Sequence, residues 1–200
     1  MNDRSEIYVD GNWVASSGVE SISVINPSTE EIIGSTPAGT KEDVDLAVKA
    51  AREAFPGWSE TSLEERLSYI ENLAAKLGEK SAEIGELISQ EVGMPGKMSM
   101  MIQAGLPAAT TASVSGTARE FPFEETIGRS LVTREAVGVV GCITPWNYPL
   151  HQIMAKVAPA MAVGCTVVLK PSEVAPLNAF LLAEIIHELN FPKGVFNLVS

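Results

Sequence analysis

Hydrophobic and polar positions alternate in the first part of the chain, which is typical of short strands. Residues 6–14 and 20–34 alternate in this way. The Asp-Gly-Asn sequence at 10–12 and the Asn-Pro-Ser-Thr sequence at 26–29 are turn signals. The pattern therefore predicts short extended segments joined by tight turns.

From residue 40 to about residue 118 the apolar positions recur at helical spacing. Thr40 can cap the first predicted helix, and residues 62–65 have the pattern of a capping box for the second. Gly93 and Pro95 end the third, and the small-residue stretch 98–118 predicts a fourth. The positions expected to face the core are Val44, Val48, Ala51 and Phe55, then Leu63, Leu67, Ile70, Leu73 and Leu77, then Ile84, Leu87, Ile88 and Val92.

The pattern changes character at about residue 121. Residues 131–135 alternate as a half-buried strand would, and residues 137–143 are apolar enough for a strand covered on both faces of a parallel sheet. The elements expected to follow are a helix at 151–163, a strand at 166–169, a helix at 176–189 and a strand at 195–199. This order predicts an α/β fold: an incomplete, Rossmann-like doubly wound parallel sheet preceded by a helical N-terminal segment.

Composition narrows the class of protein. The 200 residues are 46% hydrophobic and carry a net charge of -11, which disfavours binding to nucleic acid or to anionic membranes. The polar start at 1–10 does not resemble a secretory signal, and the longest apolar run, 136–145, is too short to span a bilayer, so we expect a cytoplasmic protein. Cys142 and Cys165 lie in apolar surroundings without a metal-ligand pattern, which predicts two reduced, buried thiols and no metal site.

Two segments that follow predicted strands carry candidate chemistry, because ligands bind beyond the carboxyl ends of strands in open parallel sheets. In the segment 143–149, two prolines stiffen a loop that holds Trp146 and Asn147. A rigid carboxamide there can donate a hydrogen bond to developing negative charge. Equally, Trp146 can be a core anchor and Asn147 a helix N-cap, and spacing alone does not decide between these interpretations.

The second segment is 170–173, Lys-Pro-Ser-Glu. An acid at the end of a Rossmann-type strand can accept hydrogen bonds from both ribose hydroxyls of a dinucleotide, and a neighbouring lysine can donate to the same sugar or to a phosphate. Taken alone, Lys170 and Glu173 fit an exposed loop pair better.

These segments, taken together, closely resemble the aldehyde dehydrogenase family. The string TPWNYP at 144–149 and the string LKPSE at 169–173 are highly specific in combination, whereas either alone is only suggestive. The strings INPST at 25–29, FPGW at 55–58 and GVFNLV at 194–199 extend the resemblance over essentially the whole chain.

The resemblance implies NAD(P)-dependent oxidation of a small aldehyde to a carboxylic acid through a cysteine thiohemiacetal and thioester. Asn147 matches the asparagine whose amide stabilises the oxyanion. Lys170, Ser172 and Glu173 match positions that hold the adenine ribose, and Glu173 should repel a 2′-phosphate, which favours NAD while leaving NADP possible. The expected cofactor-binding residues on the nicotinamide side are Ile143, Thr144, Pro145, Trp146 and Asn147.

The resemblance also implies a division of the chain into three segments. Residues 1–122 would be the N-terminal part of the cofactor-binding domain, residues 123–136 a bridging strand for assembly into a homodimer or homotetramer, and residues 137–200 the first part of the cofactor-binding sheet. The cysteine nucleophile, the general-base glutamate and a glycine-rich turn are expected beyond residue 200, so the catalytic domain would be absent and the chain alone inactive. Ile25 and Glu91 fall near a monovalent-cation site of some relatives.

Two alternatives differ in class. One is a non-catalytic fragment that acts as a cofactor-binding or assembly module. The other is an unrelated dinucleotide reductase with Cys142 as a redox thiol, although a GxGxxG turn does not follow its first predicted parallel-sheet strand. If the chain ended at residue 200, the strand at 195–199 would be an exposed apolar edge, which favours a longer native chain.

Overall fold

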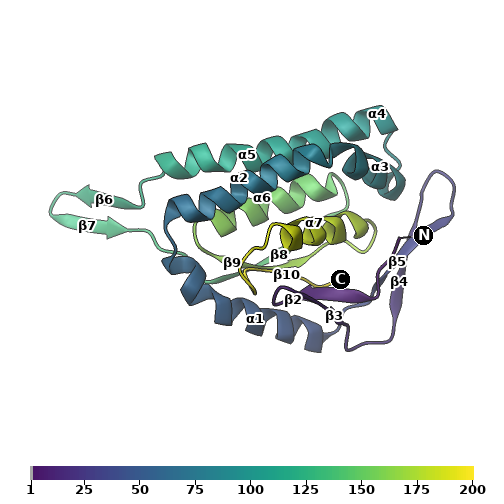
Figure 1. Ribbon diagram of the computed structural model, residues 1–200, viewed down its shortest axis with the longest axis horizontal. Coiled ribbons are helices and arrows are strands. Elements are labelled where there is room, and N and C mark those ends of the chain that lie inside the picture. The colour runs from purple at the N-terminus through teal and green to yellow at the C-terminus, as the bar shows by residue number, and fades with distance from the viewer. Residues whose placement is uncertain (1) are drawn as a thin grey trace.

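The computed structural model describes residues 2–200 and arranges them around a five-stranded sheet of order β3-β2-β10-β9-β8 (Figure 1). The last three strands in this order are parallel to one another, as predicted, while β2 and β3 are antiparallel to their neighbours. The strands are β2 (Glu6–Val9), β3 (Asn12–Ala15), β8 (Val139–Ile143), β9 (Thr166–Lys170) and β10 (Phe196–Leu198).

The predicted turn at residues 10–12 joins β2 to β3. Asp10 and Gly11 have φ values of 52° and 71°, and Val9 pairs with Asn12, so the hairpin closes through a two-residue left-handed turn. The hairpin lies against β10, where Tyr8 pairs with Leu198. The expectation of an exposed edge strand at 195–199 is therefore wrong, since β10 has a partner on each side.

The open margins of this sheet are β3 and β8. Strand β8 is not covered on both faces, contrary to the sequence prediction: Cys142 is buried, but Gly141 and Ile143 are exposed. The reason is its place at the margin, where only β9 pairs with it and the helices lie mainly over β9.

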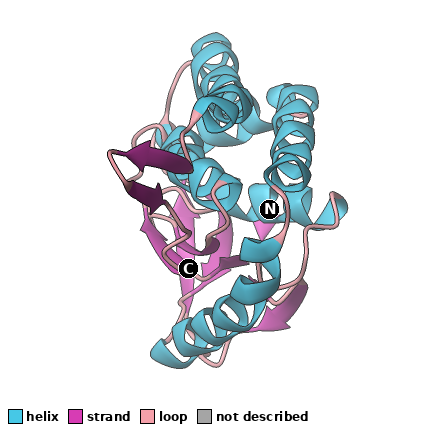
Figure 2. Ribbon diagram, turned by 90° about the vertical axis from the view of Figure 1, so that its left-hand side faces the viewer, coloured by secondary structure: helices cyan, strands magenta, loops and turns pink. Residues whose placement is uncertain are grey.

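Helices cover both faces of the sheet (Figures 1 and 2). On one face lie α6 (Pro149–Ala162) and α7 (Leu177–Glu188), and on the other lies α1 (Lys41–Glu60). A further helical layer packs over α6 and α7, formed mainly by α2 (Leu63–Glu79), α3 (Ser81–Val92) and α5 (Gly105–Glu120). The predicted α/β fold, with helices on both faces of a partly parallel sheet, is confirmed.

Helix α1 begins after Thr40, which caps it as predicted, and Ala51 is buried as predicted, but the prediction that Val44 and Val48 face the core is wrong. Val44 and Val48 are 41% and 42% exposed, whereas Ala47 and Ala51 are fully buried. The small alanine side chains allow the helix to lie close to the chain that enters β10. A Cβ at Gly194 would come within 2.6 Å of the Ala50 carbonyl oxygen. Because the backbone of α1 lies so close to the chain at Gly194, the face with the small alanine side chains packs inward and the valine side chains face outward.

The other helices follow their sequence signals more closely. Helix α2 buries Leu67, Ile70, Leu73 and Leu77, although only half of the expected capping box forms, with the Ser62 hydroxyl accepting from the Glu65 amide at 3.2 Å. Gly93 ends α3 in the left-handed conformation. The predicted helix at 98–118 is present as α4 (Gly96–Met98), a π-helical turn η1 (Ser99–Ala104) and α5.

Two buried side chains tie α1 and α2 to the end of α6. The Trp58 indole nitrogen donates to the Met161 carbonyl oxygen at 3.1 Å, and the Arg66 Nε donates to that of Ala162 at 2.9 Å. Burial lowers the pKa of the Arg66 guanidinium. Trp58 of the FPGW segment and Arg66 therefore act in packing in this chain.

Two small sheets complete the molecule. Strands β1 (Asn2–Asp3), β5 (Ile32–Pro37) and β4 (Ser21–Ile25) form one, with the predicted turn at 26–29 between β4 and β5. Strands β6 (Glu124–Ile127) and β7 (Ser130–Thr133) form the other, a hairpin that projects from the body (Figure 1). The strand predicted at 131–135 is present as β7, but it is not half-buried: of its four residues only Val132 is partly buried.

The division at residues 122 and 136 stays a prediction. Strands β2 and β3 from the first segment pair into the same sheet as the strands of the third. Between residues 2 and 200, none of the helices has the length and hydropathy needed to span a bilayer.

Candidate functional site

The two predicted loops leave neighbouring strands at the same edge of the sheet. Strands β8 and β9 are parallel, with Ile143 paired to Lys170, and the Thr144 amide donates to the Lys170 carbonyl oxygen at 3.2 Å. The carboxyl ends of both strands therefore open side by side, which is where an α/β sheet binds its ligands. The structure thus brings the two candidate segments together.

At the end of β8 and in the loop that follows it, large side chains are turned toward solvent. Ile143 is 77% exposed and Trp146 is 52% exposed. Thr144 is buried, and its hydroxyl has no hydrogen-bond partner among residues 2–200. The interpretation of Trp146 as a core anchor is therefore wrong.

Asn147 is exposed as well, and it does not cap the following helix. The N-cap of α6 is Tyr148, which has a left-handed backbone with φ 54°, and α6 begins at Pro149 without a side-chain cap. Within the part of the chain that is described, the Asn147 carboxamide makes no hydrogen bond. Its amide is therefore available to a ligand at this edge of the sheet.

In the loop after β9, Lys170 and Glu173 form an exposed pair, with 3.7 Å between Nζ and the nearer carboxylate oxygen. Lys170 Nζ also donates to the Pro171 carbonyl oxygen at 3.1 Å. The Ser172 hydroxyl accepts from the Val174 amide at 3.2 Å and so closes a tight turn. The interpretation of Lys170 and Glu173 as an exposed loop pair agrees with this geometry. The structure adds that the pair lies beside the loop that carries Asn147.

Glu91 is buried and hydrogen-bonded to the start of α7, which the sequence analysis did not predict. It is 1% exposed, and its carboxylate accepts from the Leu177 amide at 2.5 Å, the Asn178 amide at 3.2 Å and the Asn178 side-chain nitrogen at 2.8 Å. Burial raises the pKa of Glu91 to about 7, against the lowering effect of these hydrogen bonds. The one available signal was an acid on the buried face that Ile84 and Ile88 define on α3.

The remaining titratable candidates do not form a second centre. Cys142 and Cys165 are buried and unpaired, as predicted. Burial raises the pKa of the Cys142 thiol, and the nearby Lys156 lowers it to a smaller extent. Ile25 is exposed, the Glu91 carboxylate is engaged by α7, and residues 2–200 contain no cluster of three or more metal-ligating side chains.

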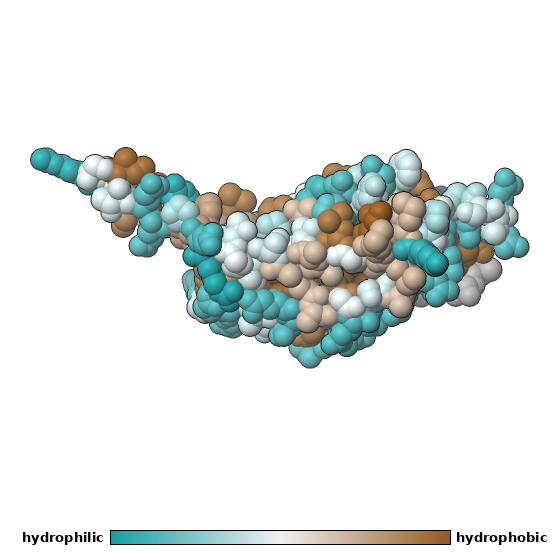
Figure 3. All heavy atoms as spheres, turned by 90° about the horizontal axis from the view of Figure 1, so that it is seen from above, coloured by the Kyte–Doolittle hydropathy of each residue, from teal (hydrophilic) through white to brown (hydrophobic). Residues whose placement is uncertain are grey.

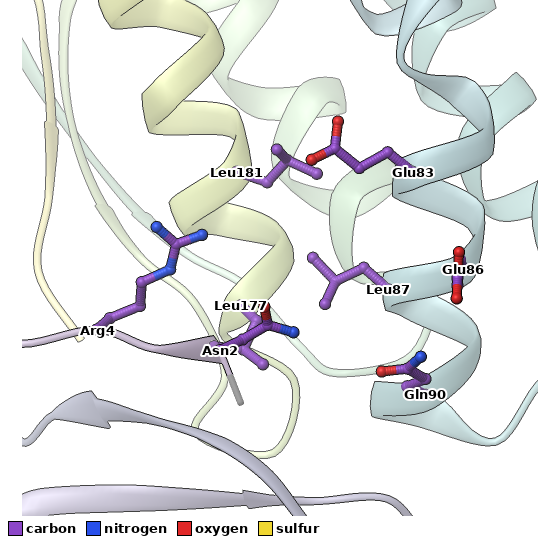
Figure 4. A pocket seen from close by; sticks show the side chains of 8 residues that line it. All are labelled: Asn2, Arg4, Glu83, Glu86, Leu87, Gln90, Leu177 and Leu181. Carbon is purple, nitrogen blue, oxygen red and sulfur yellow. The ribbon is translucent and has the colours of Figure 1, made fainter.

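A pocket of about 200 Å³ lies elsewhere, between the start of the chain, α3 and α7. Figure 4 shows Glu83, Glu86 and Leu87 on one side of it and Arg4 on the other. None of the predicted cofactor-binding residues lines it. It is separate from the edge where β8 and β9 end.

Comparison with known proteins assigns the chain to a family. The sequence profile of the Aldehyde dehydrogenase family matches residues 13–200. The chain belongs to the aldehyde dehydrogenase family. The resemblance seen in the TPWNYP and LKPSE strings is thereby confirmed at the level of the family.

Individual relatives agree with this assignment. A 3-succinoylsemialdehyde-pyridine dehydrogenase of a Pseudomonas species is 49% identical over the whole of this chain, and a putative aldehyde dehydrogenase of Staphylococcus aureus is 41% identical. The chain spans 42% of the length of each of these relatives.

Solved structures of the aldehyde dehydrogenase family match the fold closely. A mutant of aldehyde dehydrogenase C from Pseudomonas syringae, in complex with NAD+ and octanal, superposes with a TM-score of 0.95 at 44% identity, covering 98% of this chain and 40% of that one. An aldehyde dehydrogenase from Bartonella henselae superposes with a TM-score of 0.96 at 39% identity, covering 100% of this chain and 43% of that one. The relatives are enzymes, and the first of these structures contains the dinucleotide.

Proposed function

We propose that this chain supplies the oxyanion donor and part of the cofactor site of an NAD(P)-dependent aldehyde dehydrogenase that oxidises an aldehyde to a carboxylic acid. The observation that carries the proposal is the Asn147 carboxamide. It lies beyond the carboxyl end of β8 in a loop bounded by Pro145 and Pro149, and neither the core nor the N-terminus of α6 engages it. Each proline fixes its own backbone φ, which restricts the loop that carries the donor.

The role of such a donor follows from the charge that develops in the reaction. When a thiolate attacks an aldehyde carbonyl, the carbonyl oxygen becomes an oxyanion, and a preorganised amide N–H stabilises it more than it stabilises the neutral carbonyl. Removal of one such donor typically lowers the rate by about 10²–10³. We assign to Asn147 the stabilisation of the thiohemiacetal oxyanion.

The nucleophile itself is not among the residues described. Cys142 and Cys165 are both buried, and the raised pKa of Cys142 disfavours its thiolate. We therefore assign the nucleophile, and the glutamate that activates water for hydrolysis of the thioester, to sequence outside residues 1–200. On this account residues 1–200 alone do not turn over.

The residues at this edge fit a dinucleotide. Ser172 and Glu173 offer oxygen acceptors and Lys170 a charged donor for ribose hydroxyls, and the buried Thr144 hydroxyl lacks a partner within residues 2–200. Bound NAD would take up the hydride that leaves the oxidised carbon. The nicotinamide side would be lined by Ile143, the last residue of β8, and by the loop residues Thr144, Pro145, Trp146 and Asn147, of which only Thr144 is buried. The Glu173 carboxylate would repel a 2′-phosphate, so NAD is favoured over NADP.

The projecting hairpin β6–β7 supports the proposal of a homodimer or homotetramer. Ile127 and Leu131 are 57% and 63% exposed on it, and β6 and β7 pair only with each other among the described strands, so the hairpin is free to contact a second copy of the chain. Apolar residues also gather on the face that α5 forms (Figure 3). We propose that residues 98–118 contribute to the choice of a small aldehyde.

The test is an assay of the protein as the gene encodes it, to its stop codon, with NAD and a panel of aldehydes. Formation of NADH at a rate that depends on the aldehyde supports the dehydrogenase. A folded protein that binds NAD but oxidises no aldehyde would instead support a cofactor-binding module. A folded protein that neither binds NAD nor oxidises an aldehyde would support an assembly module.

A further inference from the structure

Helix α7, which follows the Lys170–Glu173 loop, begins in the interior of the molecule, with Leu177 and Asn178 each 1% exposed. Its N-cap residue is Pro176, whose side chain has no hydrogen-bond acceptor and therefore cannot cap the helix. The first amides of a helix have no partner within it, so a buried helix start needs acceptors from elsewhere. Helices α1 and α2 obtain theirs locally, from Thr40 and Ser62.

Glu91 provides the missing acceptors from a distant part of the chain. Its two oxygens take the amides of Leu177 and Asn178 at 2.5 Å and 3.2 Å. A carboxylate at this end of a helix is also favoured by the helix dipole. Because Glu91 belongs to α3, the contact fixes where α7 begins relative to the outer helical layer.

The contact extends into the loop through Asn178. The Asn178 side-chain nitrogen donates both to Glu91, at 2.8 Å, and to the Ala175 carbonyl oxygen, at 2.7 Å. The Ala175 amide in turn donates to the Ser172 carbonyl oxygen at 3.3 Å. A continuous set of hydrogen bonds therefore runs from the buried carboxylate to the turn that carries Ser172 and Glu173.

We infer that Glu91, acting through Asn178, is a positioning residue that sets the geometry of the loop holding the adenine ribose of NAD. The inference rests on the proposed function, because it takes Lys170, Ser172 and Glu173 as the ribose-binding residues. Glu91 itself is buried and does not touch the cofactor. Its contribution is to restrict the loop to the binding conformation before NAD arrives, which lowers the entropic cost of binding.

The experiment measures NAD binding in the protein as encoded to its stop codon, with the variants Glu91→Gln and Asn178→Ala. We expect the Kd and KM for NAD to rise about tenfold in each, equivalent to about 1.4 kcal/mol, while kcat at saturating NAD stays within about twofold. Because both variants break the same set of hydrogen bonds, the double variant should bind NAD about as well as either single one. Asn178→Ala retains Glu91 and its bonds to the two backbone amides, so it reports on the loop if Glu91→Gln does not fold.

Two matched variants separate the outcomes. Ile185→Val trims a fully buried side chain of α7 away from the loop, so it should lower the melting temperature without changing the Kd for NAD. Glu173→Gln tests the ribose site directly. If Glu173→Gln weakens NAD binding but Glu91→Gln and Asn178→Ala affect only the melting temperature, as Ile185→Val does, the positioning role is overturned and the proposed cofactor site stands. If Glu173→Gln leaves NAD binding unchanged, the proposed cofactor site is itself wrong and the inference falls with it.

Discussion

The close approach of α1 to the turn before β10 predicts that Gly194→Ala is strongly destabilising. Gly194 has φ +76°, and a Cβ added there would lie 2.6 Å from the Ala50 carbonyl oxygen and 2.8 Å from the Ala54 Cβ. A left-handed backbone costs a residue with a Cβ about 1–2 kcal/mol, and overpacking costs about 1–3 kcal/mol more. We therefore expect a loss of about 2–5 kcal/mol of the free energy of unfolding, a large share of the roughly 5–15 kcal/mol of a typical native protein.

The assay is equilibrium urea unfolding of the encoded protein, with thermal unfolding in parallel. The matched control is Gly57→Ala, because Gly57 lies within α1 and a Cβ there would meet nothing within 4 Å. Alanine is the better helix former, so this control should stabilise the protein by about 0.5–1 kcal/mol. A Gly194→Ala variant within about 0.5 kcal/mol of wild type would refute the reasoning, because it would mean that α1 can move away from the sheet at little cost.

Two further predictions concern α1. Burial raises the pKa of Asp43, but hydrogen bonds from neighbouring hydroxyl and amide groups outweigh this effect and bring it down to about 2. A lowered carboxyl pKa contributes stability above the unfolded value of about 4, and this contribution is lost as the pH falls through the folded value. Asp43→Asn should therefore lower the free energy of unfolding by about 1–2 kcal/mol at pH 7, and the loss should become progressively smaller from pH 4 to pH 2. A loss at pH 2 equal to the loss at pH 7 would contradict the assignment. Val44→Lys with Val48→Lys should change the free energy of unfolding by less than about 0.5 kcal/mol per site, since both side chains are partly exposed; a loss above about 2 kcal/mol would show that this face is buried in the encoded protein.

Local signals in the sequence were sufficient for most elements. The left-handed turn at Asp10 and Gly11, the cap at Thr40 and the helix end at Gly93 each depend on the backbone preferences of a few adjacent residues. Such preferences are visible in the sequence itself. These boundaries agree with the structure for that reason.

The errors arose where a contact joins distant parts of the chain. Nothing near residue 198 indicates that a strand around Tyr8 will pair with it, so β10 looked like an edge strand. On α1, hydrophobicity favoured Val44 and Val48 beside Ala51, but the short distance between helix and sheet favours Ala47, which was not predicted, over the two valines. The acceptors that Glu91 offers to α7 are likewise invisible without the fold, because 86 residues separate Glu91 from Leu177.

The candidate site was predictable in part. Its two segments could be found from residue types and from their places after strands, but spacing could not decide between a ligand-facing and a structural role for Trp146 and Asn147. The structure removes the core-anchor and N-cap roles, because Trp146 is exposed and Tyr148 occupies the cap position. For Lys170 and Glu173 the geometry is that of an exposed ion pair, so their role depends on the binding experiment.

The most direct test of the central claim is NAD-dependent aldehyde oxidation by the encoded protein with Asn147→Ala beside wild type. The side chain is exposed and makes no hydrogen bond to the rest of the described chain, so the variant should fold with an unchanged melting temperature. The account predicts that kcat falls by about a hundredfold or more, as expected when an oxyanion donor is lost. A variant that oxidises aldehydes within about twofold of the wild-type rate would contradict the assignment of Asn147.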